Sequence, residues 1–174
     1  MMTQDASVHA TAVRVGAHAV LIRGPSGAGK SRLAFDLILA GRAGQLPPTV
    51  LVGDDRVRLD TAGGEILVSA VKELAGLIEI RGLGIRRCDF VSEAVVGLVV
   101  DLAAPDAERL PPSEALQISI SGVEIPRIPV GEGLSPLPLV VAALTTAHGL
   151  PSLKDRLDCF KGIGNHMPST LATE

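Results

Sequence analysis

The chain has few of the residues that characterise several common protein classes. Among its 174 residues there is no Trp, no Tyr and only three Phe, and the formal net charge at pH 7 is −3. Without aromatic side chains for base stacking, and without a strongly basic segment, nucleic acid is not expected as a partner. Two cysteines, Cys88 and Cys159, lie far apart in the sequence. This spacing predicts reduced thiols and a cytoplasmic location.

Long apolar runs are also missing, although 47% of the residues are hydrophobic. The longest candidate, PLPLVVAALTTAHGL, contains two prolines and two threonines, and it falls short of the ~20 residues that span a bilayer. It predicts a buried helix near residues 136–149, and no membrane segment is expected. The N-terminus lacks the basic and apolar regions of a signal peptide. The length suits one domain, which we place at residues 1–150, followed by a C-terminal helix or tail at 151–174.

A glycine-rich segment is the most specific feature that the sequence does contain. Residues 20–31 read VLIRGPSGAGKS and match G-x-x-x-x-G-K-[ST] without a mismatch. An apolar strand precedes the glycines, and Leu33, Ala34, Leu37 and Ile38 follow at helical spacing, with Gly41 as the expected C-cap. A strand, a loop and a helix in this order are the context that a phosphate-binding loop requires.

Such a loop holds phosphate through its backbone. Glycines let the amides approach phosphate oxygens closely, and the helix directs the positive end of its dipole at the same anion. Lys30 is expected to reach the β- and γ-phosphates, and the Ser31 hydroxyl to ligate Mg²⁺. The predicted nucleotide-binding residues are Gly24, Pro25, Ser26, Gly27, Ala28, Gly29, Lys30 and Ser31.

The remaining segments predict an α/β fold with a single domain. Alternating β-type residues on either side of Gly16–Ala17 indicate a hairpin, and a second hairpin is expected around Gly63–Gly64. The nearly continuous β-branched run AVVGLVVDL indicates a central strand. Residues 105–114 are polar and rich in proline, so we expect a loop there. The prolines in GVEIPRIPVGEGL favour an edge strand.

Two adjacent aspartates, Asp54 and Asp55, follow the apolar strand VLVG. In enzymes with a phosphate-binding loop, an aspartate at the end of a neighbouring strand handles the metal or its water. Successive residues alternate sides of a strand, so one carboxylate can act as a base while the other holds metal or orients a partner. The alternative is a surface turn without a functional role.

Glu79 and Arg81 lie in the segment IEIRGLGIRR, two positions apart. On a strand they project to the same face, where a carboxylate and a guanidinium can ligate Mg²⁺ and clamp phosphate. An exposed ion pair is the alternative. From residue type alone His9, on the predicted first strand, is more typical of a surface or core histidine, and Arg109 of a solvated loop arginine.

Taken in order, these features resemble the catalytic domain of the HPr kinase/phosphorylase family. His9 lies 15 residues before Gly24, and GPSGAGKS, GDD and IEIRGLGI follow. The string EIRGLGI is close to a signature of that family. The likeness extends from about His9 to Leu150. It implies a short form limited to the C-terminal catalytic domain, without the additional N-terminal domain of longer members.

The resemblance implies a fold like the nucleotide-binding core of phosphoenolpyruvate carboxykinase, assembled as a hexamer. Such enzymes use ATP and Mg²⁺ to phosphorylate a serine of HPr, the phosphocarrier protein of the sugar phosphotransferase system. Many also run the reverse reaction, in which inorganic phosphate attacks phosphoserine and pyrophosphate is released. By this resemblance Lys30 contacts the phosphates, while Ser31 and Glu79 hold Mg²⁺.

The resemblance also implies the catalytic residues. Asp55 matches the proton acceptor of phosphorylation and the donor of the reverse step, and Asp54 lies beside it. His9 matches the active-site histidine and Arg109 the arginine of a later loop. Arg81 belongs to a segment expected to line the site in both directions.

The sequence departs from the family pattern in three places. Arg32 stands where an acidic residue is expected after GKS, and GQLPPT has the form of an insertion before the aspartates. Glu132 and Gly133 occupy the place of a basic stretch that longer members use in dephosphorylation. A carboxylate there disfavours the approach of inorganic phosphate, so the phosphorylase reaction is expected to be weak or absent.

Two other functions are compatible with a phosphate-binding loop. One is a small-molecule kinase, although the sequence contains neither an arginine-rich lid nor a second substrate domain. The other is a nucleotide-binding regulator, whose turnover is incidental to the control of a partner. The paired aspartates, Glu79 and Arg81 favour a complete active site instead.

Overall fold

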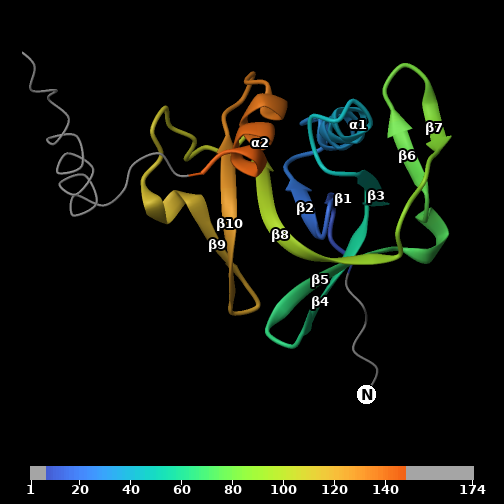
Figure 1. Cartoon of the computed structure of the whole chain (residues 1–174), viewed down its shortest axis with the longest axis horizontal. Helices are drawn as coiled ribbons and strands as arrows, with labels where there is room; N and C mark the ends of the chain where they lie inside the picture. Colours follow the sequence, from blue (N-terminus) through green and yellow to red (C-terminus); the bar gives the residue numbers. More distant parts are fainter. Residues whose placement is uncertain (1–6, 148–174) are drawn as a thin grey trace, which may run out of the picture.

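A mixed β-sheet is the framework of the protein, whose computed structural model describes residues 7–147 (Figure 1). Within this range eight strands form one sheet in the order β3-β1-β2-β8-β10-β9, with β5 paired to β8 and β4 to β5. A separate hairpin consists of β6 and β7. The strands are β1 (Thr11–Val15), β2 (His18–Arg23), β3 (Thr49–Gly53), β4 (Val57–Ala62), β5 (Glu65–Ala70), β6 (Leu77–Ile80), β7 (Gly84–Arg87), β8 (Glu93–Leu102), β9 (Gln117–Ile120) and β10 (Val123–Val130).

Helices are few and lie mainly on one side of the sheet. The two α-helices in the described part are α1 (Lys30–Arg42) and α2 (Pro136–Thr145), and short 3-10 turns occur at η1 (Lys72–Leu74) and η2 (Ser113–Leu116). Figure 1 shows the β6–β7 hairpin beside α1, whereas the β4–β5 hairpin extends from the opposite end of the sheet. No described helix has the length and apolar character needed to cross a membrane.

Two hydrophobic clusters cover the two faces of the sheet. On one face α1 contributes Leu33 and Leu37, which pack with Val100 of β8. On the other face Val68 of the β4–β5 hairpin packs with Val99. Because residues on both faces of β8 are buried, this strand needs apolar residues at successive positions. The central strand predicted from AVVGLVVDL is therefore confirmed.

Parallel pairing places the carboxyl ends of three strands at one edge of the sheet. β8 runs parallel to β2 on one side and to β10 on the other. The predicted hairpin of β1 and β2 is confirmed, with Val15 opposite His18 across Gly16–Ala17. The hairpin around Gly63–Gly64 is also confirmed, since Ala62 pairs with Glu65. The glycine-rich loop at 24–29 follows β2 directly, at the edge where β8 and β10 also end.

The C-cap predicted at Gly41 is wrong. Helix α1 continues to Arg42, Ala43 is its C-cap, and Gly44 adopts the left-handed φ of 73° just beyond. Gly41 serves a packing role instead, because a Cβ there would lie 2.7 Å from Thr49 Oγ1 and 2.8 Å from Thr49 Cβ. Only glycine allows α1 and β3 to approach this closely.

The buried helix predicted near 136–149 is corrected in two respects. Helix α2 ends at Thr145, and the hydroxyls of Thr145 and Thr146 donate to the carbonyls of Val141 and Ala142. Val140 is its only buried residue, because α2 is covered on one side only, where Val140 joins the cluster containing α1. The end of that prediction, the tail at 151–174 and Cys159 lie outside the described residues.

The edge position predicted for GVEIPRIPVGEGL is also wrong, since β10 lies between β8 and β9. Its first half, Val123–Pro126, pairs with β9, whereas its second half, Arg127–Val130, pairs with β8. Each half therefore has one paired side, and a proline is tolerated wherever its missing N–H faces the free side. The unpaired side of β10 changes from one half of the strand to the other, and this explains why prolines occur in a strand that lies inside the sheet order.

Candidate active site

The glycine-rich loop, residues 24–29, lies between β2 and α1, as predicted. Gly24 has a φ of 149°, and a Cβ at this position would come within 3.0 Å of Leu102 Cβ and Leu102 O. The loop can therefore leave the sheet beside the end of β8 only because its first residue is glycine. Helix α1 begins at Lys30, immediately after the loop, so its free amides and positive dipole end open onto this segment.

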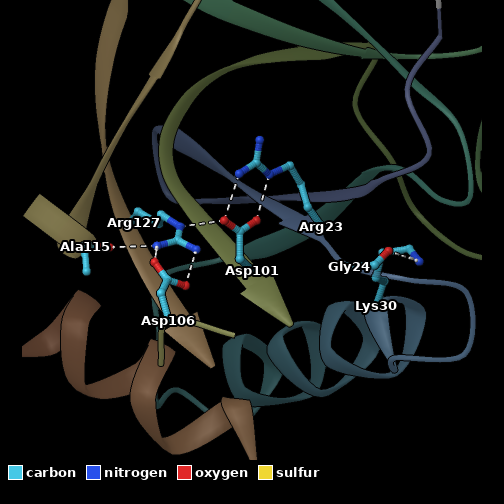
Figure 2. Close-up of polar contacts among 7 residues, drawn as sticks. All are labelled: Arg23, Gly24, Lys30, Asp101, Asp106, Ala115 and Arg127. Carbon is cyan, nitrogen blue, oxygen red and sulfur yellow. Dashed lines mark hydrogen bonds and ion pairs between the residues drawn. The ribbon is translucent and has the colours of Figure 1, made fainter. Parts of the chain in front are cut away.

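Lys30 is buried and lies across the loop (Figure 2). Its Nζ donates to the carbonyl oxygens of Gly24, at 3.0 Å, and Pro25, at 3.1 Å. Burial lowers the pKa of Lys30, and the negative charges of Asp55 and Asp54 oppose that shift. The ammonium is thus already positioned at the loop, where phosphate oxygens can replace the two carbonyl oxygens as its acceptors.

Asp54 is the buried centre of the site, with 4% of its surface exposed. Its Oδ1 accepts hydrogen bonds from Thr11 Oγ1 and from Ser31 Oγ, each at 2.7 Å. Its Oδ2 accepts from the backbone N–H of Glu79 at 2.9 Å. One carboxyl group therefore joins β1, the start of α1 and the β6–β7 hairpin.

Asp55 has the opposite environment. Its side chain is 65% exposed, and its Oδ1 lies 3.4 Å from His9 Nε2. Its φ of 65° is in the left-handed region, which non-glycine residues adopt at a cost and which recurs at functional sites. The two neighbouring carboxylates thus face different sides, one bound inside the protein and one open to solvent. His9 itself lies just before β1 and not on it, because the chain bends between Val8, which pairs with Val57, and Thr11.

The turn of the β6–β7 hairpin reaches the glycine-rich loop. Glu79 is on β6, and its exposed side chain extends from the residue whose amide binds Asp54. The prediction that Arg81 continues the same strand is wrong, since β6 ends at Ile80 and Arg81 begins the turn. That turn nevertheless brings Arg81 to the loop, because its Nη2 lies 3.9 Å from where a Cβ on Gly27 would be.

The oxygen atoms available as metal ligands around Ser31 suit Mg²⁺. Ser31 offers a hydroxyl, while Asp54 and Glu79 offer carboxylates, and Mg²⁺ prefers one or two such carboxylates together with substrate phosphates and water. No group of three or more His, Cys, Asp or Glu residues that could hold a metal by itself occurs within residues 7–147. The donor set therefore fits a metal held jointly with a nucleotide and does not form an all-protein metal site.

Arg109 is the one predicted residue that the structure does not bring to this cluster. It is exposed in the loop between β8 and η2. No hydrogen bond or ion pair among residues 7–147 links it to the aspartates or to the glycine-rich loop. Its predicted role stays a prediction.

Sequence reasoning missed an ion-pair network beside the loop, formed by Arg23, Asp101, Arg127 and Asp106 (Figure 2). Arg23 donates from Nε and Nη2 to the two carboxylate oxygens of Asp101, at 2.7 and 2.8 Å. Arg127 donates from Nε to Asp101 Oδ2 at 2.6 Å, and its Nη1 and Nη2 donate to Asp106 at 2.7 and 3.0 Å. Charged residues at the ends of two apolar strands, VLI–Arg23 and LVV–Asp101, were the available signal.

Hydrogen bonds within this network shift the pKa values of its members toward their charged forms. Burial by itself raises the pKa of Asp101, but the hydrogen bonds from Arg23 and Arg127 outweigh that effect and lower it. Hydrogen bonds from Arg127 likewise lower the pKa of Asp106, and these pairings raise the pKa of Arg127. Asp101, Asp106 and Arg127 therefore stabilise one another in their charged forms.

Thr11 was missed as well. Its hydroxyl contacts Asp54 from a fully buried position. A single threonine in an apolar strand carries no local sequence signal of such a partner, which is 43 residues away.

Comparison with known proteins shows the family of this chain. The family model described as HPr Serine kinase C-terminal domain matches residues 1–148. The HPr kinase/phosphorylase of Mycoplasma mycoides subsp. mycoides is 34% identical over 155 residues, covering 80% of this chain and 47% of the relative. That of Geobacillus thermodenitrificans is 36% identical over 140 residues, covering 73% and 43%. The chain thus spans less than half the length of these two relatives.

A solved structure supports the same assignment. The structure of the Hpr(Ser) kinase/phosphatase from Coxiella burnetii matches with a TM-score of 0.63 at 26% sequence identity, covering 89% of this chain and 99% of that one. The mixed α/β fold is therefore shared, and the family expected from EIRGLGI and the glycine-rich loop is confirmed. The chain belongs to the HPr Serine kinase C-terminal domain family.

Proposed function

We propose that this protein is a protein-serine kinase that transfers the γ-phosphoryl group of ATP to a serine of HPr. The observation that carries the proposal is the difference in environment between two neighbouring aspartates. Asp54 is buried and holds Ser31 and the backbone of Glu79, whereas Asp55 is exposed beside His9. A fixed carboxylate next to a free one, at a glycine-rich loop, is the arrangement that phosphoryl transfer to a hydroxyl needs.

In this proposal free backbone amides of the loop and of the start of α1 hold the ATP phosphates, and Lys30 exchanges its carbonyl partners for β- and γ-phosphate oxygens. Ser31 and Glu79 hold Mg²⁺, with Asp54 orienting the Ser31 hydroxyl. The metal supplies charge neutralisation for the transferred group. Arg81 lies close enough to Gly27 to pair with phosphate oxygens from the opposite side.

Asp55 is the proposed base. A serine hydroxyl is a weak nucleophile, so its proton has to leave as the new P–O bond forms, and a positioned carboxylate accepts it. In the reverse direction the protonated carboxyl returns that proton. His9 Nε2 lies 3.4 Å from Asp55 Oδ1, close enough to orient this carboxylate toward the incoming hydroxyl.

The family resemblance supports four further parts of the proposal. We expect a core of the phosphoenolpyruvate carboxykinase kind, a hexameric assembly, a cytoplasmic location and a role for Arg109 near the reacting groups. The reverse phosphorolysis is expected to be weak or absent, because Glu132 adds a negative charge next to the glycine-rich loop, where inorganic phosphate has to approach.

Intact-mass measurement of HPr tests the kinase proposal. After incubation with the protein, ATP and Mg²⁺, HPr should gain the mass of one phosphate, and fragmentation should place it on serine. HPr with that serine replaced by alanine is the matched control and should stay unmodified. If HPr remains unmodified while a small metabolite is phosphorylated, the protein is a small-molecule kinase and the proposal is wrong. Phosphoserine-HPr with excess phosphate should release little or no pyrophosphate.

A further inference from the structure

A cavity of about 300 Å³ lies against the glycine-rich loop. Three chain segments enclose it: the loop itself at 25–28, the end of β8 and the residue after it, and the chain that leaves β10. Its lining residues are Pro25, Ser26, Gly27, Ala28, Leu102, Ala103, Val130, Gly131, Glu132, Gly133, Leu134 and Pro136. Asp54, Asp55, His9, Glu79 and Arg81 are absent from this lining. The volume is at the lower end of the range of small-ligand pockets.

The ion-pair network drawn in Figure 2 joins the strands that lead into the three segments around this cavity. Arg23 directly precedes Gly24 of the loop, and Asp101 directly precedes Leu102. Arg127 lies on β10 three residues before Val130. The side chains of Arg127 and Asp101 are only 12% and 14% exposed, and they are joined at 2.6 Å. These bonded side chains restrain the strands that lead into the three walls, and restraint of a site before a ligand arrives reduces the cost of binding.

The polarity of the lining restricts what the cavity can hold. Glu132 is the only ionisable residue among those that line it, and polar atoms make up most of the exposed lining although most of the other residues are apolar or glycine. A carboxylate accepts hydrogen bonds and donates none, so it disfavours a phosphate group and favours hydroxyl groups. The loop on one side of the cavity offers the opposite, with free amides at the start of α1 and the ammonium of Lys30.

We propose that this cavity holds the nucleoside of the bound nucleotide, with the ribose hydroxyls donating to the carboxylate of Glu132. The inference rests on the proposed function, because it requires the phosphates to lie on the glycine-rich loop. The residues 25–28 belong to both the loop and the cavity, so one nucleotide can occupy both. Leu134, an exposed apolar side chain of the lining, then faces the base.

Equilibrium binding of three probes tests this subsite. ATP carries phosphates and ribose hydroxyls, 2′,3′-dideoxy-ATP lacks the hydroxyls, and inorganic tripolyphosphate lacks the nucleoside. Wild-type protein should bind ATP more tightly than either of the other two. Glu132→Gln should weaken ATP binding by about five- to tenfold, and should leave dideoxy-ATP and tripolyphosphate binding unchanged or slightly tighter. Glu124→Gln, the same change elsewhere on the β10 region and outside this cavity, should alter none of the three.

The outcomes separate the two proposals. If wild-type protein binds neither ATP nor tripolyphosphate, the proposed function and the subsite are both wrong. If it binds tripolyphosphate as tightly as ATP, the loop holds phosphate but the cavity holds no nucleoside, so the subsite alone is overturned. Equal loss of ATP and dideoxy-ATP in Glu132→Gln would overturn the contact with the ribose. Because Glu132 is exposed, its replacement is not expected to impair folding.

Discussion

At the scale of single residues, Asp54 and Asp55 have opposite environments because the strand before them ends at Gly53. Asp54 still points inward, where Thr11 and Ser31 reach it. Asp55 then takes a left-handed φ of 65°, and its side chain faces solvent and His9. One carboxylate therefore organises the site and the other remains free to exchange a proton.

Replacing Asp54 should reduce stability. Asp54→Asn replaces an acceptor that serves two hydroxyls and one amide with a group that also donates, so at least one buried partner is left without an acceptor. We expect the free energy of unfolding to fall by about 1–3 kcal/mol, measured by urea denaturation. The matched control, Asp55→Asn, should change it by less than about 0.5 kcal/mol. Equal stability of the two variants would contradict the account of Asp54.

The sequence was sufficient to predict most of the residues that meet at the site, although it missed Thr11 and added Arg109, and it did not predict the different environments of the two aspartates. The glycine-rich loop, the aspartates and the EIRGLGI segment are local patterns with a recognisable spacing. Which aspartate is buried depends on Thr11 and on the backbone of Glu79, which come from other strands. Contacts between distant segments of this kind leave no periodic signal in the chain.

At the scale of elements, close packing against β3 fixes the C-terminal end of α1, the helix that begins at the glycine-rich loop. Gly41 lies in the last turn of α1, against Thr49 at the start of β3. The two elements contact each other directly there, and the chain returns from one to the other through residues 43–48. Any side chain at Gly41 has to push the helix away from the sheet.

Gly41→Ala separates packing from helix propensity. Alanine favours a helix interior over glycine by roughly 1 kcal/mol, so propensity alone predicts a more stable protein. The contacts at 2.7–3.0 Å with Thr49 predict a loss of about 1–3 kcal/mol instead, as for other overpacked sites. Thermal or urea unfolding decides between them. A stabilised variant would show that the helix shifts without cost and that the close approach is unimportant.

The sequence predicted those elements whose ends are marked by neighbouring residues. It did not predict the position or exposure of elements that depend on contacts with distant strands and helices. The turn at Gly16–Ala17 and the helix after the loop follow from neighbouring residues. The position of β10 in the sheet depends on β8 and β9, which the prolines of β10 cannot reveal. The exposure of α2 was likewise not predictable from its own residues. Its composition is apolar, but other elements cover only one side of it.

At the scale of the whole molecule, the network of Arg23, Asp101, Arg127 and Asp106 connects the parts that surround the nucleotide-binding edge. It links β2, β8 and β10 with the loop that follows β8. Arg127 also donates to the carbonyl of Ala115 at 3.0 Å, near the far end of that loop. The edge where three strands end is thereby held as one unit.

The network predicts a specific dependence of stability on pH. Because the pKa of Asp101 is lowered in the folded protein, its contribution is fully present above the unfolded pKa, near pH 4, and is lost as the pH falls through the folded value. Asp101→Asn should therefore cost about 3 kcal/mol at pH 7, and the difference from wild type should shrink below about pH 4.

Denaturant unfolding at several pH values measures this difference. The exposed Asp60→Asn is the control and should change stability by less than about 0.5 kcal/mol at neutral pH. A constant gap between wild type and Asp101→Asn across the acid range would mean that the charge of Asp101 does not contribute, and that the variant is destabilised for another reason.

The most direct measurement for the whole account is the single-turnover rate of phosphate transfer to HPr by wild-type protein and by Asp55→Asn, both saturated with ATP and Mg²⁺. Intact-mass sampling over time gives both rates. The account predicts one phosphate on HPr with the wild type and a rate about 10²–10⁴-fold lower with Asp55→Asn, while the two proteins bind ATP equally. Transfer at the wild-type rate by Asp55→Asn, or no transfer to HPr by either protein, would contradict it.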